Sequence, residues 1–383
     1  MEHFKTRDEL NSFLDSVREF ALGLDPIAQK IDGDNRLPAR EVIRMFREKG
    51  LWNCGFPKKY GGMGLSFSEY WRVLANVALT GRSIALLFHG HNTGNWRLID
   101  VMGTTEQKER YLPRLSNGEM LISLCLTERE AGTGRDIKSY ATKQGNKWCL
   151  NGEKYLISYS DLADEFCVIA YSNREKGEIS VFMVKKGAAG FSRKRMGNSM
   201  GCRGSIHGTL EFKDVEIRAE DVLVRGGLET ILDYLDISRT AIAAQCLGLA
   251  RRCYELAVDY SKKRNTFGKS ISERQAIQTM IANMAVSLYA LESSIADTAK
   301  KIDLGKPVRR EAASCKRLGI DTVREVTDNA LLVHGGRGYF DEFPLEMLYR
   351  DGRAMWFEEG TPQIQNLAVA REALSQPKWW DTI

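Results

Sequence analysis

The chain has 383 residues, of which 43% are apolar and 27% charged, a composition that excludes a disordered protein and suits two or three globular domains. The net charge of +5 is a weak bias on so large a surface and does not by itself indicate a nucleic-acid-binding protein. No stretch approaches the roughly 20 apolar residues that a membrane-spanning helix needs, and the charged beginning is unlike a secretory signal. We therefore expect a cytoplasmic protein without a membrane segment, whose eight singly spaced cysteines are reduced.

Hydrophobic periodicity predicts three regions in chain order. From residue 1 to 118 apolar residues recur every three or four positions, which predicts an N-terminal helical domain. From 119 to 225 short β-branched and aromatic runs such as FCVIAY (166–171) are separated by turn residues, which predicts a central β-barrel-like domain. Helical spacing returns from 226 to 383 and predicts a C-terminal bundle, so the fold class is α+β. A Rossmann fold is disfavoured because HGGRG (334–338) lies between helical segments and follows no strand.

Motifs in all three regions resemble those of the flavin-dependent acyl-CoA dehydrogenases and occur in that family's order. They are PKKYGGMGLS (57–66), LTEREAG (126–132), NGEKYLIS (151–158), MGCRGS (200–205), LDISR (235–239), KRNTFGK (263–269), HGGRGY (334–339), YRDGR (349–353) and EGTPQIQ (359–365). Together they span about four-fifths of the chain. The resemblance implies the family's N-terminal helical domain, central β-domain and C-terminal four-helix domain. It also implies FAD as cofactor and the α,β-dehydrogenation of an acyl thioester.

Such a reaction needs a base that removes the α-proton while the flavin accepts a hydride from the β-carbon. The resemblance places this base at Glu359. A carboxylate with an ordinary pKa of about 4.3 is a weak base, so the role requires burial that raises the pKa, and AMWF (354–357) is apolar enough to bury it. The competing readings are a surface carboxylate at Glu359 and a base at Glu358, whose side chain would point in a different direction. A minority of the family carries the base just before the arginine of LDISR, where this chain has Ser238, which cannot act as a base.

Cofactor contacts follow from the same resemblance. It implies that Thr127 and Ser158 lie beside the flavin ring and that Thr133 contacts the pyrophosphate. It also implies that Arg264 and Phe267 reach the cofactor of a partner subunit. Turn capping is the alternative role for the three hydroxyl residues.

The remaining candidate site residues are two glycines and two charged or polar pairs. Gly335 and Gly336 suit a close approach of the backbone to the cofactor, although a helix-ending turn would also explain them. Thr361 and Gln363 match family positions near the dinucleotide. Asp236 and Arg239 match a pair near the substrate thioester, and an exposed ion pair on a helix is the equally weighted alternative.

Several positions depart from the family pattern around the cofactor. Leu156 stands where tryptophan is common, Leu332 where glutamine is common, and Arg129 where proline is usual. These changes favour a specialised substrate or an altered redox use over ordinary fatty-acid oxidation. His89 and His91 form H-x-H without a third ligand at useful spacing, so we expect surface or capping histidines and no metal site.

Partners also follow from the resemblance. It implies an acyl-CoA substrate, reoxidation by an electron-transfer flavoprotein with oxygen left open, and a homotetramer because cofactor sites are completed between subunits. One alternative is an acyl group on an acyl carrier protein that docks on the basic clusters at 185–186, 193–195 and 309–310. Two others are a nucleic-acid-binding homologue, which we consider unlikely, and a flavin-binding structural protein without turnover.

Overall fold

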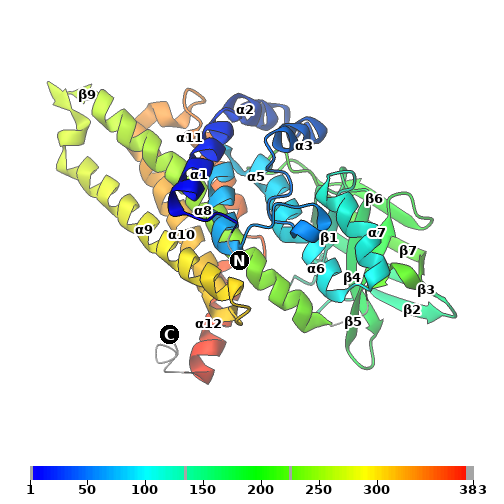
Figure 1. Ribbon diagram of the computed structural model, residues 1–383. Coiled ribbons are helices and arrows are strands. Elements are labelled where there is room, and N and C mark those ends of the chain that lie inside the picture. Colours follow the sequence, from blue (N-terminus) through cyan, green and yellow to red (C-terminus); the bar gives the residue numbers. More distant parts are fainter. Residues whose placement is uncertain (1–2, 133–135, 224–226, 377–383) are drawn as a thin grey trace.

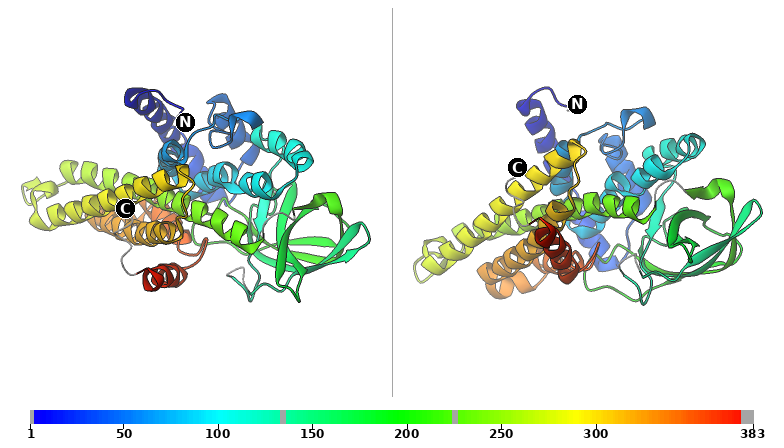
Figure 2. Two further views of the ribbon diagram at one scale, coloured as in Figure 1. Left: turned by 60° about the horizontal axis from the view of Figure 1, so that its bottom comes forward. Right: turned by 90° about the horizontal axis from the view of Figure 1, so that it is seen from below.

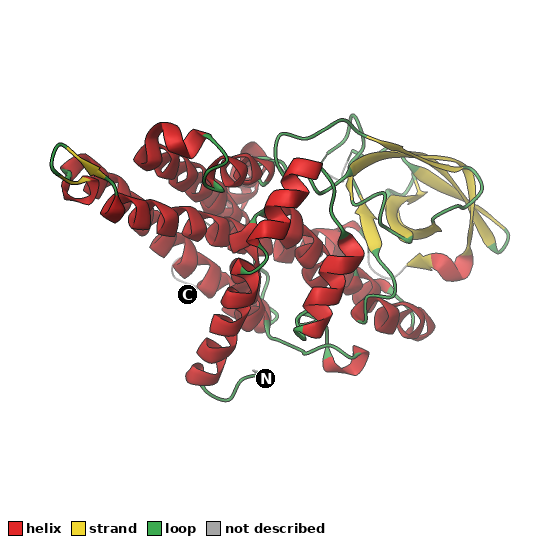
Figure 3. Ribbon diagram, turned by 90° about the horizontal axis from the view of Figure 1, so that it is seen from above, coloured by secondary structure: helices red, strands yellow, loops and turns green. Residues whose placement is uncertain are grey.

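The computed structural model describes residues 3–132, 136–223 and 227–376, in which helices, a sheet and long helices follow one another along the chain (Figure 1). The predicted α+β architecture is therefore confirmed. The sheet lies at one end of the molecule and the long helices extend away from it, as the view from above shows (Figure 3). In these three ranges no helix is long and apolar enough to cross a membrane.

The N-terminal region consists of short helices. They are α1 (Arg7–Leu22), α2 (Asp25–Asp34), α3 (Ala39–Glu48), α4 (Phe67–Val77), α5 (Arg82–His89), α6 (Trp96–Met102) and α7 (Thr105–Ser116), with short turns η1 (Lys58–Tyr60), η2 (Ala78–Thr80) and η3 (Gly90–Gly94). Sequence signals fix two of their starts, because Ser66 with Glu69 and Thr104 with Gln107 form capping boxes. The apolar faces of α1 to α5 share one core with α8 of the C-terminal region, whereas α6 and α7 pack in a second core with the sheet and the first turns of α8.

The middle region is a strongly curved sheet that curls round on itself (Figure 2). Its strands are β1 (Ile122–Cys125), β2 (Tyr140–Gln144), β3 (Lys147–Ser158), β4 (Glu165–Asn173), β5 (Glu178–Lys185), β6 (Phe191–Arg195), β7 (His207–Arg218) and β8 (Val222–Leu223), and η4 (Ala219–Asp221) precedes β8. The order is β6-β7-β3-β2-β4-β5-β8, and β1 pairs with β4 in parallel. The FCVIAY run forms β4 and is buried over most of its length, as expected for a strand covered on both faces.

The C-terminal region is built on three long helices. Its elements are α8 (Leu228–Lys263), β9 (Asn265–Thr266), β10 (Lys269–Ser270), η5 (Ile271–Glu273), α9 (Gln275–Asp303), α10 (Arg309–His334), η6 (Gly335–Tyr339), α11 (Leu345–Ala354) and α12 (Pro362–Ser375). Helix α8 runs from the sheet to the far end of the molecule (Figure 1). It crosses α4 closely at Gly248, where an added Cβ would lie 1.9 Å from the Ala75 carbonyl oxygen.

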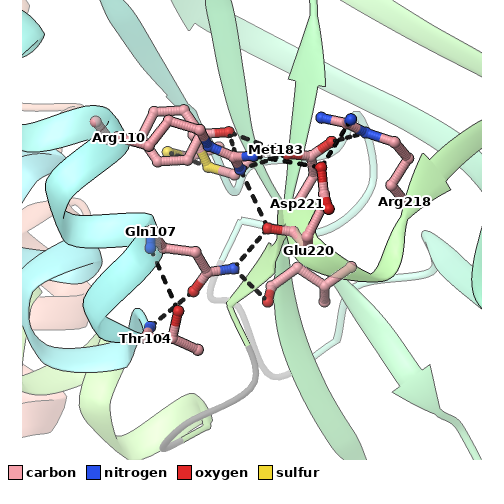
Figure 4. A network of polar contacts seen from close by, with 10 residues as sticks. Thr104, Gln107, Arg110, Met183, Arg218, Glu220 and Asp221 are labelled. Atoms are coloured by element: carbon pink, nitrogen blue, oxygen red, sulfur yellow. Dashed lines mark hydrogen bonds and ion pairs between the residues drawn. The ribbon is translucent and has the colours of Figure 1, made fainter.

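A polar cluster fastens the N-terminal helices to the sheet just before α8 begins (Figure 4). Arg110 on α7 forms an ion pair of 2.5 Å with the buried carboxylate of Asp221, which also accepts from Arg218 Nε at 2.9 Å. Gln107 Nε2 donates to the Val222 carbonyl at 3.0 Å. The contacts join α7 to the last strand of the sheet and the turn before it.

We expect Asp221→Ala to lower the free energy of unfolding by about 2 kcal/mol, because it leaves partly buried guanidinium donors without their acceptor. Glu220 is the matched control, since its carboxylate is exposed and Glu220→Ala should change stability by less than about 0.5 kcal/mol. Urea denaturation measures both variants. Equal stabilities would show that the cluster does not hold the two regions together.

Candidate active site

A cavity of about 1060 Å³ lies where the three regions of the chain meet. Its walls come from α5 and η3, from β1 and the loop after it, from the end of β3, from the loop 195–207, from α8, and from the turn that follows α11. The predicted site residues in these walls are Thr127, Ser158, Arg239, Glu359 and Thr361. The fold therefore brings residues of all three regions to one hollow.

The turn that carries Glu359 has an unusual backbone. Glu359 has φ +51° and Gly360 has φ +98°, so both lie in the left-handed region, which costs about 1 kcal/mol at a non-glycine residue. Buried donors hold the carbonyls of this turn. Arg239 Nε donates to the Glu359 carbonyl at 3.2 Å, Gln365 Nε2 donates to it at 2.9 Å, and Lys316 Nζ donates to the carbonyls on both sides of Glu359.

The Glu359 carboxyl is enclosed and accepts a hydrogen bond of 3.1 Å from Ser238 Oγ. Burial raises the pKa of this carboxyl above its ordinary value, although Arg239, Lys316 and the Ser238 hydroxyl each act to lower it. A raised pKa is the condition that sequence analysis set for a base at this position.

The neighbouring carboxylate is already engaged. Glu358 forms an ion pair with Arg82 of α5, a fully buried guanidinium that also donates to Gln245 of α8. Releasing Glu358 for catalysis would leave a buried cation unpaired, which is costly. Both carboxylates line the cavity, and Glu358 is the one whose charge is already held in an ion pair.

Sequence reasoning missed Lys316. Its side chain is 0% exposed, and burial lowers its pKa to about 8 even though Glu359 and Glu358 favour the charged form. In the sequence it precedes Arg317, so the pair reads as a solvated helix face. No local pattern distinguishes a lysine whose amino group extends into solvent from one that donates to the backbone of a turn 42 residues away.

The opposite wall carries hydroxyl groups. Ser158 Oγ lies 3.0 Å from His207 Nε2, and His207 Nδ1 lies 2.8 Å from the Ser205 carbonyl. Nδ1 must donate to that carbonyl, so in the neutral ring Nε2 accepts from Ser158 and the Ser158 oxygen is left as an acceptor for a ligand. His207 is a second residue that sequence analysis did not single out.

A buried ion pair supports the loop that carries Thr127. Lys154 Nζ lies 2.8 Å from Glu128 Oε1 and donates to the Leu126 carbonyl at 2.9 Å. Glu128 also accepts the backbone N–H groups of residues 138 and 139. These contacts hold Leu126 and Glu128, the two neighbours of Thr127 in the chain.

The positions that depart from the family pattern have distinct surroundings. Leu156 lines the cavity and is 49% exposed, so it covers this wall less than a larger aromatic side chain would. Leu332 is exposed on α10, and Arg129 pairs with Glu153 at 3.2 Å outside the cavity.

The exposed ion pair considered for Asp236 and Arg239 is wrong in one respect. The two side chains do pair at 2.5 Å, but Asp236 is buried and Arg239 is only 11% exposed, and Arg309 provides a second contact to Asp236 at 3.4 Å. Burial raises the pKa of Asp236 against the effect of both arginines. Asp236 does not line the cavity, so it orients Arg239, which does.

The expectation of surface histidines is also wrong. His89 and His91 are both buried, and burial lowers the pKa of each to about 3. His91 stacks on Trp52 with ring centroids 4.0 Å apart. Both histidines follow the apolar run of α5, and the tertiary packing of this segment buries them.

Other predicted residues lie away from the cavity within one chain. Arg264 and Phe267 belong to the hairpin at the far end of α8, and Gly335, Gly336 and Gln363 are likewise absent from the cavity wall in the described residues. Thr133 lies outside the described residues.

The hairpin that carries Phe267 has a two-residue turn. Phe267 has φ +48° and Gly268 φ +77°, the left-handed pair that a tight hairpin requires. Phe267 is 98% exposed at its tip, so a large aromatic side chain extends into solvent within one chain.

Family models match nearly the whole chain. The acyl-CoA dehydrogenase N-terminal domain matches residues 7–119, the middle domain residues 123–215 and the C-terminal domain residues 225–374. Acryloyl-CoA reductase (NADH) of Anaerotignum propionicum is 35% identical over 94% of this chain and 93% of that protein. The short-chain specific acyl-CoA dehydrogenase of Clostridium acetobutylicum is 32% identical over 92% of this chain and 95% of its own length.

Solved structures agree with these matches. Butyryl-CoA dehydrogenase from Megasphaera elsdenii superposes with a TM-score of 0.91 at 30% identity, covering 97% of this chain and 99% of that one. A chain from the structure titled as the electron transferring flavoprotein of Acidaminococcus fermentans has a TM-score of 0.91 at 31% identity, covering 98% and 100%.

Proposed function

The chain belongs to the acyl-CoA dehydrogenase family, flavoprotein oxidoreductases that act on CH–CH bonds, and from this premise we propose that Glu359 is its catalytic base. The observation that carries the proposal is the partly buried Glu359 carboxyl at the cavity wall, which accepts a hydrogen bond from Ser238 and has a raised pKa. In its charged form this carboxylate removes the α-proton of an acyl thioester bound in the cavity. Arg239 and Lys316 then keep the turn in place as the carboxyl changes charge.

The cavity fits a flavin as well as an acyl chain. It is large, and on the wall formed by the ends of β1 and β3 it offers the Thr127 hydroxyl and the Ser158 oxygen, whose own hydrogen is directed to His207. We propose that FAD is bound there, where it would supply the acceptor for the β-hydride. The apolar wall of Leu86, Leu87 and Trp96 would receive the acyl group and exclude water from it.

Turnover of a thioester is favoured over the alternative roles. The relatives named above are dehydrogenases and reductases, so we favour neither a nucleic-acid-binding nor a purely structural role. CoA is the proposed carrier and an acyl carrier protein the alternative. We also propose a cytoplasmic location and reoxidation by an electron-transfer flavoprotein, a choice supported by the likeness to a chain from the Acidaminococcus fermentans structure.

Loss of flavin absorbance under anaerobic conditions tests this function. The purified yellow protein is mixed with acyl-CoA thioesters of several lengths and, separately, with the same acyl groups on an acyl carrier protein. Bleaching by the CoA series supports the proposal, and bleaching only by the carrier-protein series would select the alternative. An unbleached flavin with every thioester would contradict dehydrogenation itself.

We propose that the active oligomer is a homotetramer in which Arg264 and Phe267 complete a neighbour's cofactor site. Their exposure in one chain, together with the exposed Leu332, Tyr339 and Phe340 of α10, η6 and the segment after it, supports an interface there. A fixed guanidinium at a pyrophosphate suits this geometry.

Mixing two inactive variants tests the shared site. Glu359→Gln lacks the base but keeps Arg264, whereas Arg264→Glu keeps the base but places a negative charge where a phosphate is expected. Neither homo-oligomer should turn over at more than about 1% of the normal rate. Co-expressed mixtures should regain activity, because one kind of site then combines an intact Glu359 with an intact Arg264. Mixtures as inactive as the parents would show that each chain builds its site alone.

A further inference from the structure

We propose that Ser238 is a positioning residue whose buried hydroxyl holds the Glu359 carboxylate. This inference rests on Glu359 being the base. Ser238 stands at the position where a minority of the family carries that base, and here the structure assigns its hydroxyl a different task.

The chain of contacts crosses from the C-terminal bundle into the N-terminal helices. Ser238 Oγ on α8 lies 3.1 Å from Glu359 Oε1 and 3.4 Å from His89 Nε2 at the end of α5. His89 Nδ1 lies 3.2 Å from Thr93 Oγ1 of η3, and Thr93 Oγ1 lies 2.8 Å from the Tyr70 hydroxyl of α4. Ser238, His89, Thr93 and Tyr70 are all buried.

The donors along this chain do not all point the same way. Ser238 gives its hydroxyl hydrogen to Glu359, and Thr93 Oγ1 gives its hydrogen to the Tyr70 hydroxyl. Burial, with a smaller contribution from Arg82, lowers the pKa of His89 to about 3, so the ring is neutral and carries one N–H. The Thr93 oxygen can only accept from His89 Nδ1, so His89 Nε2 has no hydrogen for Ser238 and is a second acceptor near its hydroxyl.

A hydroxyl that donates to a carboxylate stabilises its charged form and fixes its orientation. The far end of the chain of contacts, at Tyr70, is only 1% exposed, so the chain is not a route by which the proton reaches solvent. The hydrogen bond from Ser238 opposes the effect of burial, which without it would raise the pKa of Glu359 further. Ser238 thus keeps the carboxylate ionised and in a fixed orientation.

Other groups face the same carboxyl from the elements around it. Arg239 and Tyr234 come from α8, Lys316 comes from α10, and Glu358 is its neighbour in the turn. None of them is changed in the variants below, so a shift can be assigned to the hydroxyl that was removed.

The test uses the flavin-loaded protein and two readouts. Infrared titration follows the protonated carboxyl band, with Glu359→Gln as the blank that identifies it. Exchange of the α-protons of acetyl-CoA into D₂O, measured by mass spectrometry, reports proton removal alone, because acetyl-CoA has no β-carbon. Ser238→Ala should raise the pKa of Glu359 by about one unit and lower exchange about tenfold on the acidic side of the profile.

Two variants separate this effect from a structural one. Ser238→Thr keeps the hydroxyl and should restore the original pKa and exchange profile. Ser261→Ala makes the same substitution on the same helix, at another fully buried serine whose hydroxyl donates to the Val258 carbonyl, and should leave both readouts unchanged. His89→Leu should not raise the pKa of Glu359, because His89 Nε2 gives Ser238 no hydrogen.

The outcomes distinguish this inference from the proposed function. An unchanged Glu359 pKa in Ser238→Ala would overturn the positioning role even if Glu359→Gln abolishes exchange. A Glu359 pKa raised in His89→Leu as much as in Ser238→Ala would overturn the assignment of the effect to the Ser238 hydroxyl alone. Exchange in Glu359→Gln at the normal rate would instead remove Glu359 as the base, and the proposed mechanism with it.

Discussion

Glu359→Gln should retain bound flavin and lose turnover by about a thousandfold or more, because an amide fills the same space and cannot accept the α-proton. The fold should be unaffected, since Ser238 still finds an oxygen acceptor on the Gln side chain and the carbonyl contacts of the turn do not involve the carboxyl. The measurement is the rate of anaerobic flavin bleaching by an acyl-CoA at saturation, with flavin content read from the visible spectrum.

Glu358→Gln is the matched control for this prediction. It removes the charge of the adjacent carboxylate, which pairs with Arg82, and it keeps an oxygen for that guanidinium. We expect some loss of stability but bleaching within about tenfold of normal. If Glu358→Gln were the inactive variant and Glu359→Gln the active one, the assignment of the base would be reversed.

The pH dependence of the bleaching rate tests the same prediction, and its direction follows from the raised pKa. Burial raises the pKa of Glu359, and only the ionised carboxylate accepts a proton, so the rate should rise with pH through that raised pKa and level off above it. A rate that falls as the pH rises through the acidic range would contradict a carboxylate base.

Lys316→Met should lower turnover by about a hundredfold while the protein stays folded. The variant keeps the length of the side chain but releases the carbonyls on either side of Glu359, so the left-handed turn is no longer held. A shift of the base by about 1 Å is enough for a loss of this size. Two unpaired carbonyls cost about 1–3 kcal/mol each, and removal of a buried charge offsets part of this.

Arg317→Met, the next residue of α10, is the control for Lys316. Arg317 pairs with Asp321 on its own helix and is partly exposed, so its loss should affect neither bleaching nor thermal stability by much. Thermal unfolding and bleaching are measured for both variants. Normal turnover in Lys316→Met would show that Arg239 and Gln365 hold the turn without it.

Much of the architecture could be predicted from the sequence because it depends on local patterns. The three- and four-residue spacing of apolar residues predicted the helices, and the β-branched run at 166–171 predicted a strand, which is β4 in the structure. The resemblance placed the candidate base at Glu359 beside Gly360, and both residues have a left-handed backbone in the structure. These features depend on neighbours within a few residues, so the amino-acid sequence alone is enough to predict them.

Only the tertiary structure decided which polar side chains are buried and what they face. Ser238, His89 and Lys316 lie on three different helices, far apart along the chain, and each reads in isolation as an ordinary helix residue. Their roles arise where α5, α8 and α10 meet beneath the turn at Glu359, and the energy of a buried charge or hydroxyl depends on that meeting. The sequence by itself determined the family, the order of the elements and the candidate base, because repeated local spacing and short motifs encode them. The side chains that keep this base ionised and oriented are brought to it by long-range packing, because no local pattern indicates which helices will contact one another.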